Sequence, residues 1–367
     1  MSQLTAPPKQ AAAPGAMPNS YATGRLPRFV PWIILVGAFV VMFAVFALFA
    51  VSDPEGGFNA PGAVFLAVVL YGVVIYFVAR MIEGPRRAVD RLVTTLVTLA
   101  FVVALLPLIS LLSTVILNGT ARLDLTFFTN SMRNVVGEGG GALHAVIGTV
   151  FMTGAAALIS IPIGLLTSIY LVEYGRGRLA RAITFFVDVM TGIPSIVAGL
   201  FAYTLFVIFF GPGIRLGIAG AIALAVLMIP VVVRSSEEML RLVPNELREA
   251  AFALGVPKWL VVLKVVLPTS IAGLTTGIML AISRVIGETA PLLVAAGYTN
   301  NMNYDLGEGR MQSLPVFVYS SYVSQGTEAQ AYLDRAWTGA LTLILIVMAL
   351  NLLARLIARA FSPKLSR

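Results

Sequence analysis

Long apolar runs separated by polar joints divide this chain. Eight runs have about 20 or more residues, the length with which an α-helix crosses roughly 30 Å of hydrocarbon. They cover residues 30–51, 61–82, 92–117, 143–172, 182–210, 214–234, 268–291 and 337–358. A membrane β-barrel shows alternating segments of roughly ten residues instead. The pattern therefore predicts an all-α, polytopic membrane bundle with eight spanning helices.

The joints and ends suggest how the chain is organised. Residues 1–29 are rich in Pro, Ala, Ser and Gln and have no apolar period, which is typical of a disordered tail. The first apolar run is too long for a signal-peptide core and is expected to stay as an anchor. We expect a cytoplasmic tail at 1–29, two extra helices with a basic loop at 30–91, a six-span core at 92–358 and a second tail at 359–367.

Composition agrees with a membrane protein and excludes several kinds of chemistry. Apolar residues make up 58% of the chain and charged residues 11%, less than half of the ~25% that is usual in soluble domains. There is no cysteine and only one histidine, so disulfides, thiolate metal sites and Cys or Ser-His nucleophiles are not expected. The phosphate-binding GxxxxGK[ST] pattern is also absent from the sequence. We expect neither an enzyme nor a bound metal or cofactor.

The basic residues are distributed unevenly among the joints. If the N-terminus is cytoplasmic, 19 of the 25 Lys and Arg residues fall on the cytoplasmic side, five on the outer side and one inside a span. Cytoplasmic loops of membrane proteins carry such an excess. The net charge of +8 is therefore a signal of orientation, with both termini cytoplasmic, and does not indicate nucleic acid.

One long joint, residues 235–267, lies on the predicted cytoplasmic side. It predicts a helix that begins near Pro244 or Asn245 and ends at Leu254, with Gly255 supplying a turn of positive φ. A second short helix, 258–265, leads to the span that Pro268 opens. The small residues of the first helix leave room for another surface, so this segment predicts a docking element.

The same residues resemble a family motif. The spacing resembles the EAA loop of ABC importer permeases, and is carried by Glu249, Ala250, Ala251, Gly255, Val265, Leu267 and Pro268. The family form has Ile where Val265 stands. The resemblance implies that this helix couples to a separate ATPase subunit by seating in a groove of it. The alternative is an amphipathic interfacial helix with a chance match.

Two ionisable residues lie within the predicted span 268–291. Arg284 and Glu288 are four residues apart, which would place them on one helix face where they can pair. Ionisable groups in the bilayer are costly and usually functional, and Arg can hold an oxyanion with two hydrogen bonds. The alternative is an ion pair that fastens neighbouring helices.

Around this pair the sequence is very similar to the A-type permease subunits of phosphate ABC importers. The similar segments are 283–292, 188–200 and Leu314-Pro315, and the resemblance extends over roughly residues 92–358. It implies a phosphate path formed by Arg284, Glu288, Ser283 and Thr289 in a bacterial cytoplasmic membrane. It also implies three partners: a second permease subunit, an ATPase dimer that binds ATP and Mg²⁺, and an extracytoplasmic phosphate-binding protein.

Further residues and alternative functions complete the prediction. Gly192 and Pro194 interrupt an apolar span, as a functional helix break or as a packing kink. Asp188 is expected to be the buried partner of a basic residue, and the glycine-rich residues 137–141 to be a flexible linker. Three alternative functions remain: an ABC permease for sulfate or molybdate, a proton-coupled anion transporter using Glu288, and a structural subunit.

Overall fold

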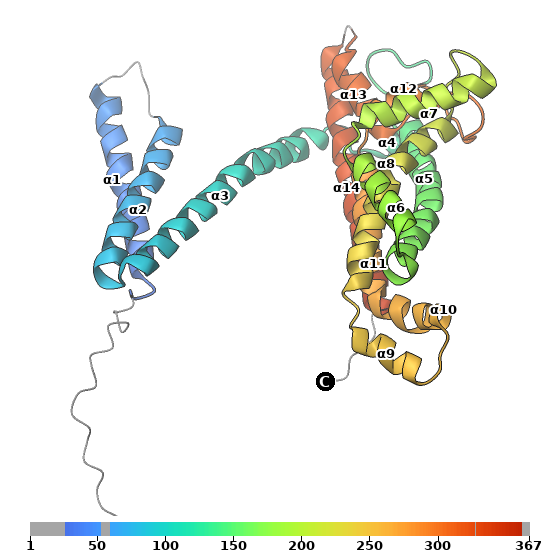
Figure 1. The fold of residues 1–367 in the computed structure, drawn as a ribbon. Helices are drawn as coiled ribbons and strands as arrows, with labels where there is room; N and C mark the ends of the chain where they lie inside the picture. The colour runs from blue at the N-terminus through green and yellow to red at the C-terminus, as the bar shows by residue number, and fades with distance from the viewer. Residues whose placement is uncertain (1–25, 53–58, 327, 362–367) are drawn as a thin grey trace, which may run out of the picture. The chain divides into compact units, whose positions relative to one another are not determined.

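The computed structural model describes residues 26–52, 59–326 and 328–361 (Figure 1). Most of the predicted tail 1–29, and residues 362–367 of the second tail, lie outside these ranges. All regular structure in the described residues is helical, which confirms the predicted fold class. In this described part of the chain, seven helices are long and apolar enough to cross a membrane, and a helix pair bent by 107° gives an eighth if it counts as one span.

The chain folds as two compact units, Met1–Leu111 and Leu112–Arg367. The division falls within one long helix, α3 (Pro85–Gly119). The helix begins seven residues before the predicted span, because Gly84, with φ +90°, makes the turn and Pro85 then opens the helix. The basic joint predicted at 83–91 is thus mainly the first two turns of α3. The predicted domain boundary at residues 91/92 stays a prediction.

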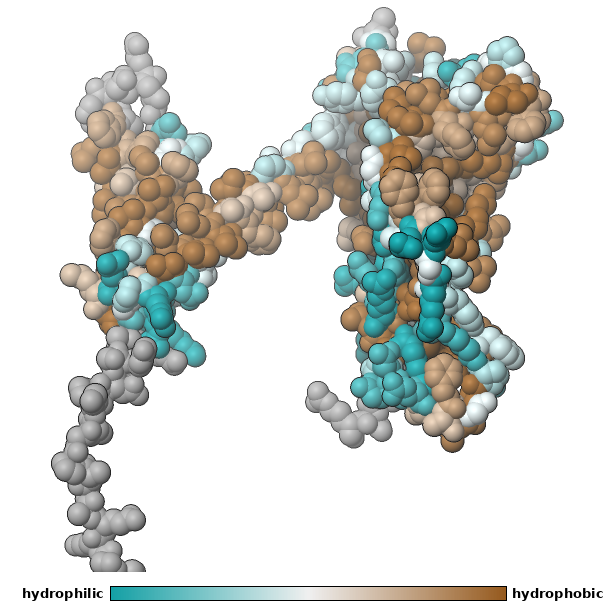
Figure 2. Space-filling model, viewed as in Figure 1, coloured by the Kyte–Doolittle hydropathy of each residue, from teal (hydrophilic) through white to brown (hydrophobic). Residues whose placement is uncertain are grey.

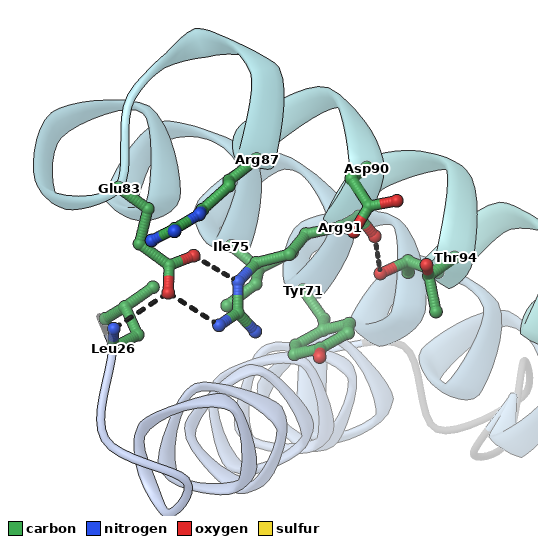
Figure 3. Close-up of a pocket in the computed structure, with 9 residues that line it drawn as sticks. Leu26, Tyr71, Ile75, Glu83, Arg87, Asp90, Arg91 and Thr94 are labelled. Carbon is green, nitrogen blue, oxygen red and sulfur yellow. Dashed lines mark hydrogen bonds and ion pairs between the residues drawn. The ribbon is translucent and has the colours of Figure 1, made fainter. Parts of the chain in front are cut away.

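The N-terminal unit contains α1 (Val30–Ser52), α2 (Ala60–Ile82) and the first part of α3. At the α2–α3 turn, the buried Glu83 carboxylate accepts hydrogen bonds from Arg91 Nε and Nη2, at 2.5 and 2.9 Å, and from the Leu26 amide at 2.8 Å (Figure 3). The Arg91 bonds are the main reason why the pKa of Glu83 falls from 4.5 to about 2. Glu83 therefore fastens the segment before α1 to the start of α3.

The C-terminal unit is a bundle whose α9 end and α13 end lie opposite each other (Figure 1). Its elements after α3 are α4 (Leu125–Thr129), α5 (Leu143–Ile169), the π-helix η1 (Tyr170–Tyr174), α6 (Arg178–Thr191), α7 (Ser195–Phe210), α8 (Gly217–Arg241), α9 (Asn245–Ala253), α10 (Lys258–Val261), the π-helix η2 (Val262–Val266), α11 (Leu267–Val285), α12 (Ala290–Ala295), α13 (Leu314–Val323) and α14 (Ala329–Phe361).

Helix α8 is the centre of this bundle. In its apolar window 61% of the residues are buried, against 6–28% in the other candidate spans. It packs on α5, α7 and α11, and its Leu224, Met228 and Val232 form one core with residues of α5 and α11. The exposed apolar faces of the outer helices are those that a bilayer or another subunit covers.

Small residues allow α5 to pack closely on its neighbours. A Cβ on Gly148 would overlap the carbonyl oxygen of Gln312, and one on Gly164 would lie 2.6 Å from Val232 Cγ1. Gly154, on the same helix, has no atom within 4 Å of the position that its Cβ would take. Close approach therefore depends on Gly148 and Gly164.

We predict that Gly148→Ala destabilises the protein, whereas Gly154→Ala does not. Overpacking a close contact costs about 1–3 kcal/mol, because the Gln312 backbone must move. At an open helical position, alanine stabilises the folded protein by roughly 0.5–1 kcal/mol relative to glycine, so Gly154→Ala should not destabilise it. The loss of folded protein on heating in detergent measures both effects. Equal midpoints for the two variants would contradict the close contact.

A buried arginine organises the glycine-rich segment at the α13 end. Arg335 is fully buried, and its Nη1 donates to the carbonyl oxygens of Gly137 and Gly139 at 2.6 and 3.0 Å. Its guanidinium lies over the Tyr332 ring, 4.4 Å from the centroid. Arg122 Nη2 donates to the Gly140 carbonyl oxygen at 3.0 Å. Residues 137–141, expected to be a flexible linker, are thus held at three carbonyl oxygens.

Candidate functional site

The first part of the candidate site is α9, in the long polar joint. Glu246 lies in its first turn, where a negative charge stabilises the helix by interacting with the positive end of its dipole. The helix ends at Ala253, and Gly255 follows with φ +76°, a conformation that a residue with a Cβ rarely adopts. The predicted helix and its glycine turn are confirmed. The second predicted helix is α10, which continues through η2 into α11.

The two alanines of the motif lie on different faces of α9. Ala251 is 9% exposed and packs with Leu240, Val243 and Val261 inside the unit. Glu249 and Ala250 are exposed. Large apolar side chains are also exposed on and around α9, among them Leu254 at 83% and Trp259 at 58%. The outer face of α9 is therefore free for a partner, while Ala251 positions the helix.

A clamp that the sequence did not predict holds α9 in place. Arg248 donates to Glu173 of η1 at 3.0 Å and to the carbonyl oxygens of Val243 and Leu240 at 2.5 and 2.9 Å. The Arg248 and Glu173 side chains are 13% and 7% exposed. Lys258 donates to the Glu173 carbonyl oxygen and lies over the Tyr174 ring. Both π-helices border this clamp, as π-bulges often border functional sites.

We predict that Arg248→Met loosens α9 while the bundle stays folded. The change leaves the buried Glu173 carboxylate without its partner, which costs about 3–5 kcal/mol. Hydrogen exchange of the α9 amides, followed by mass spectrometry, should become roughly 100-fold faster or more. The double variant Glu173→Gln/Arg248→Met should recover part of the protection. Unchanged exchange in the single variant would contradict the clamp.

A second ionic group joins α6 to α8. Arg234 is paired with Asp188 and, at 2.8 Å, with Glu237, which also binds Arg241 at 2.5 Å. The expected basic partner of Asp188 is therefore present. The expected burial is wrong, because the Asp188 side chain is 59% exposed. The buried acid is Glu237, which receives both arginines.

The second part of the candidate site is the end of α11, which corrects the sequence prediction. The helix stops at Val285, so Glu288 lies in a turn and does not share a helix face with Arg284. No ion pair joins them in the described residues. Gly287 and Pro291 break the helix that their apolar neighbours indicated.

Arg284 itself is exposed, and no partner for it is present in the described ranges. Ser283, on the same turn, is half-buried with its Oγ 3.5 Å from Asn351 Oδ1 of α14. Glu288 and Thr289 are half-buried, and Thr289 precedes α12 as its N-cap residue. The four predicted path residues thus surround one helix break. An unpaired arginine at the end of an apolar helix needs a polar surface to face.

The helix break at Gly192 and Pro194 is present and is connected to this region. Helices α6 and α7 meet there at 107°. Downstream, Gly199 of α7 packs so closely on α12 that a Cβ would lie 2.5 Å from Pro291 Cα. The break therefore directs α7 onto α12, two residues from Thr289. In the described residues no cluster of three or more His, Cys, Asp or Glu could hold a metal ion.

Comparisons with known proteins cover both parts of the site. A model of the family described as "Binding-protein-dependent transport system inner membrane component" matches residues 160–367. The chain is 47% identical over 283 residues to the phosphate transport system permease protein PstA 1 of Mycobacterium tuberculosis, covering 76% of this chain and 91% of that protein. It is 40% identical over 285 residues to PstA of Pasteurella multocida, covering 77% and 97%.

A solved structure has the same fold. An inward-facing structure of the MetNI methionine ABC transporter matches with a TM-score of 0.51 and 21% identity, covering 60% of this chain and 96% of that chain. The residues from 160 onward that match the family model include α9 and the end of α11. The family match therefore extends over both parts of the candidate site.

Proposed function

Because the chain belongs to the family of binding-protein-dependent transport system inner membrane components, and within it to the PstA phosphate transport permeases, we propose that it is a permease subunit of an ATP-driven phosphate importer. The observation that carries the proposal is the 47% identity to a phosphate permease across 91% of that protein's length. The chain is a multi-pass membrane protein, with seven helices among its described residues that are suited to spanning.

Arg284 is the proposed phosphate contact in the membrane. Its guanidinium is exposed and unpaired in the described residues, and it can offer two parallel N–H donors to a phosphate oxygen pair. Ser283 and Thr289 supply hydroxyl groups on either side of the break. Glu288 repels the anion, which prevents tight trapping and lets phosphate leave. The exposed side of Arg284 faces the second permease subunit, which completes the path.

Helix α9 is the proposed coupling element. Glu249 and Ala250 present the outer face to a groove of the ATPase, and Gly255 and the Arg248 clamp keep α9 rigid against η1 and α8. ATP and Mg²⁺ bind to the ATPase, and its closure moves α9. The bent α6–α7 pair, broken at Gly192 and Pro194, transmits that motion to α12 through the Gly199–Pro291 contact.

The proposed orientation places the α9 end and both termini in the cytoplasm. The uneven distribution of arginines and lysines supports it. The complex then has three further components: a PstC-like permease, a PstB-like ATPase dimer, and a PstS-like phosphate-binding protein that docks at the α13 end.

Phosphate uptake by the reconstituted complex tests the proposal directly. The four components are reconstituted so that α9 faces the inside of the proteoliposome, where ATP is enclosed. Labelled phosphate supplied outside with the binding protein should then accumulate inside. A tenfold excess of sulfate should compete little. Uptake without ATP, driven by a proton gradient, would favour a secondary transporter, and strong competition by sulfate would favour another oxyanion as substrate.

A further inference from the structure

The N-terminal unit contains a polar cavity that the proposed import does not use. It has a volume of about 480 Å³ and lies at the α2–α3 turn, where Figure 3 shows Arg87 and Arg91 near Glu83. Glu83 already accepts three hydrogen bonds, two from Arg91 and one from the Leu26 amide, and the charge of Arg87 also contributes to its lowered pKa. In contrast, Arg87 Nη1 is buried and has no hydrogen-bond partner in the described residues. The cavity thus retains an unsatisfied cationic donor.

The charges around this cavity favour an anion. Residues 26–111 of the described chain carry five arginines and two acidic residues. Arg87, Arg91, Glu83 and Asp90 line the cavity, and Arg91 is paired with Glu83. Asp90 is exposed to solvent and lies further along α3, beside Thr94. Figure 2 shows polar side chains gathered at this turn and apolar surface over the helices beyond it.

An apolar groove adjoins the polar cavity. It has a volume of about 460 Å³, shares Tyr71, Thr94 and Thr95 with the cavity, and is lined further along by Trp32, Phe39 and Val102. From Arg87 to Val102 the helix rises by about 22 Å, at 1.5 Å per residue. One bilayer leaflet with its headgroup region is roughly 20–22 Å thick. The two cavities therefore have the length and the polarity of one lipid molecule.

We propose that the N-terminal unit binds one anionic phospholipid, with its phosphate on Arg87 and an acyl chain in the groove between α1, α2 and α3. A guanidinium binds a phosphodiester through paired N–H donors, and basic pockets between helices on the cytoplasmic side hold anionic headgroups. A free oxyanion would leave the adjoining apolar groove empty, whereas a lipid fills it with an acyl chain. The occupant is therefore a lipid. The inference uses the proposed membrane orientation and is independent of phosphate import.

Native mass spectrometry of the purified complex tests the site. The complex is delipidated and then titrated with phosphatidylglycerol or with phosphatidylcholine of the same chains. We expect one phosphatidylglycerol per copy of this chain. Arg87→Gln should weaken it by about tenfold or more, because the charge-assisted hydrogen bonds to the phosphate are lost. The matched control is Arg86→Gln, because Arg86 is exposed and does not line the cavity.

A second variant keeps the test decisive if Arg87→Gln does not fold. Val68→Trp fills the groove and should also reduce phosphatidylglycerol binding by about tenfold while Arg87 stays in place. Equal binding of phosphatidylcholine, displacement by inorganic phosphate, or binding unaffected by Arg87→Gln or by Val68→Trp would each overturn the proposal.

Discussion

Replacing Arg284 by glutamine is expected to reduce phosphate uptake strongly. The residue lies at the end of α11, exposed and unpaired within the described chain. Hydrogen bonds to a charged group are worth about 1.5–3 kcal/mol each, so loss of the paired donors should lower transport by roughly 30-fold or more. Because Arg284 has no internal ion pair to lose, the variant should fold and assemble normally. ATP-dependent uptake of labelled phosphate into proteoliposomes measures the effect.

Two further variants separate recognition of the anion from charge alone. Arg284→Lys keeps the charge but loses the planar paired donors, so its uptake should lie between wild type and Arg284→Gln. Arg355→Gln removes an exposed arginine of α14 that has no ion pair in the described residues, and should leave uptake unchanged. Full uptake by Arg284→Gln, with normal assembly, would refute the role given to this residue and favour a structural one.

Periodicity and local breakers were enough to predict much of this fold. Seven of the eight apolar runs correspond to long helices in the described residues, since length and composition alone decide whether a helix suits a bilayer. The run 182–210 is instead a pair of helices bent by 107°. Gly255 and the break at Gly192 and Pro194 were predicted because glycine and proline act through their own backbone. The end of α11 at Val285 differs from the predicted span, although Gly287 and Pro291 are signals of the same kind. The apolar residues around them extended the run and concealed the break.

Contacts between distant segments were beyond local reasoning. Arg248 and Glu173 are 75 residues apart, and only the packing of η1 against α9 brings them together. The burial of Arg335 under the glycine-rich segment has the same origin, because a charged residue in a joint is normally expected in water. The sequence motif assigns Ala250 and Ala251 of α9 the same role, as small residues that let a partner approach. The packing of α9 on Leu240 and Val243 buries Ala251 and leaves Ala250 exposed, and the motif alone does not predict this difference.

That difference leads to the second large prediction, for Ala250. A tyrosine at this exposed position should leave the permease folded but prevent close approach of the ATPase. Overpacking a tight contact costs about 1–3 kcal/mol, so the ATPase should bind roughly 10- to 100-fold more weakly and uptake should fall accordingly. Copurification of the ATPase with the permease, together with phosphate uptake, measures both consequences.

The neighbouring alanine provides the contrast, because Ala251→Tyr acts inside the chain. Ala251 packs on Val243 and Val261, so its replacement should lower the stability of the isolated permease, whereas Ala250→Tyr should not. Ala250→Ser keeps a small side chain and should preserve ATPase binding. If Ala250→Tyr copurifies with the ATPase as wild type does, α9 is not the contact. If instead it destabilises the isolated permease, then its outer face is not free, and coupling must pass through another surface of the α9 end.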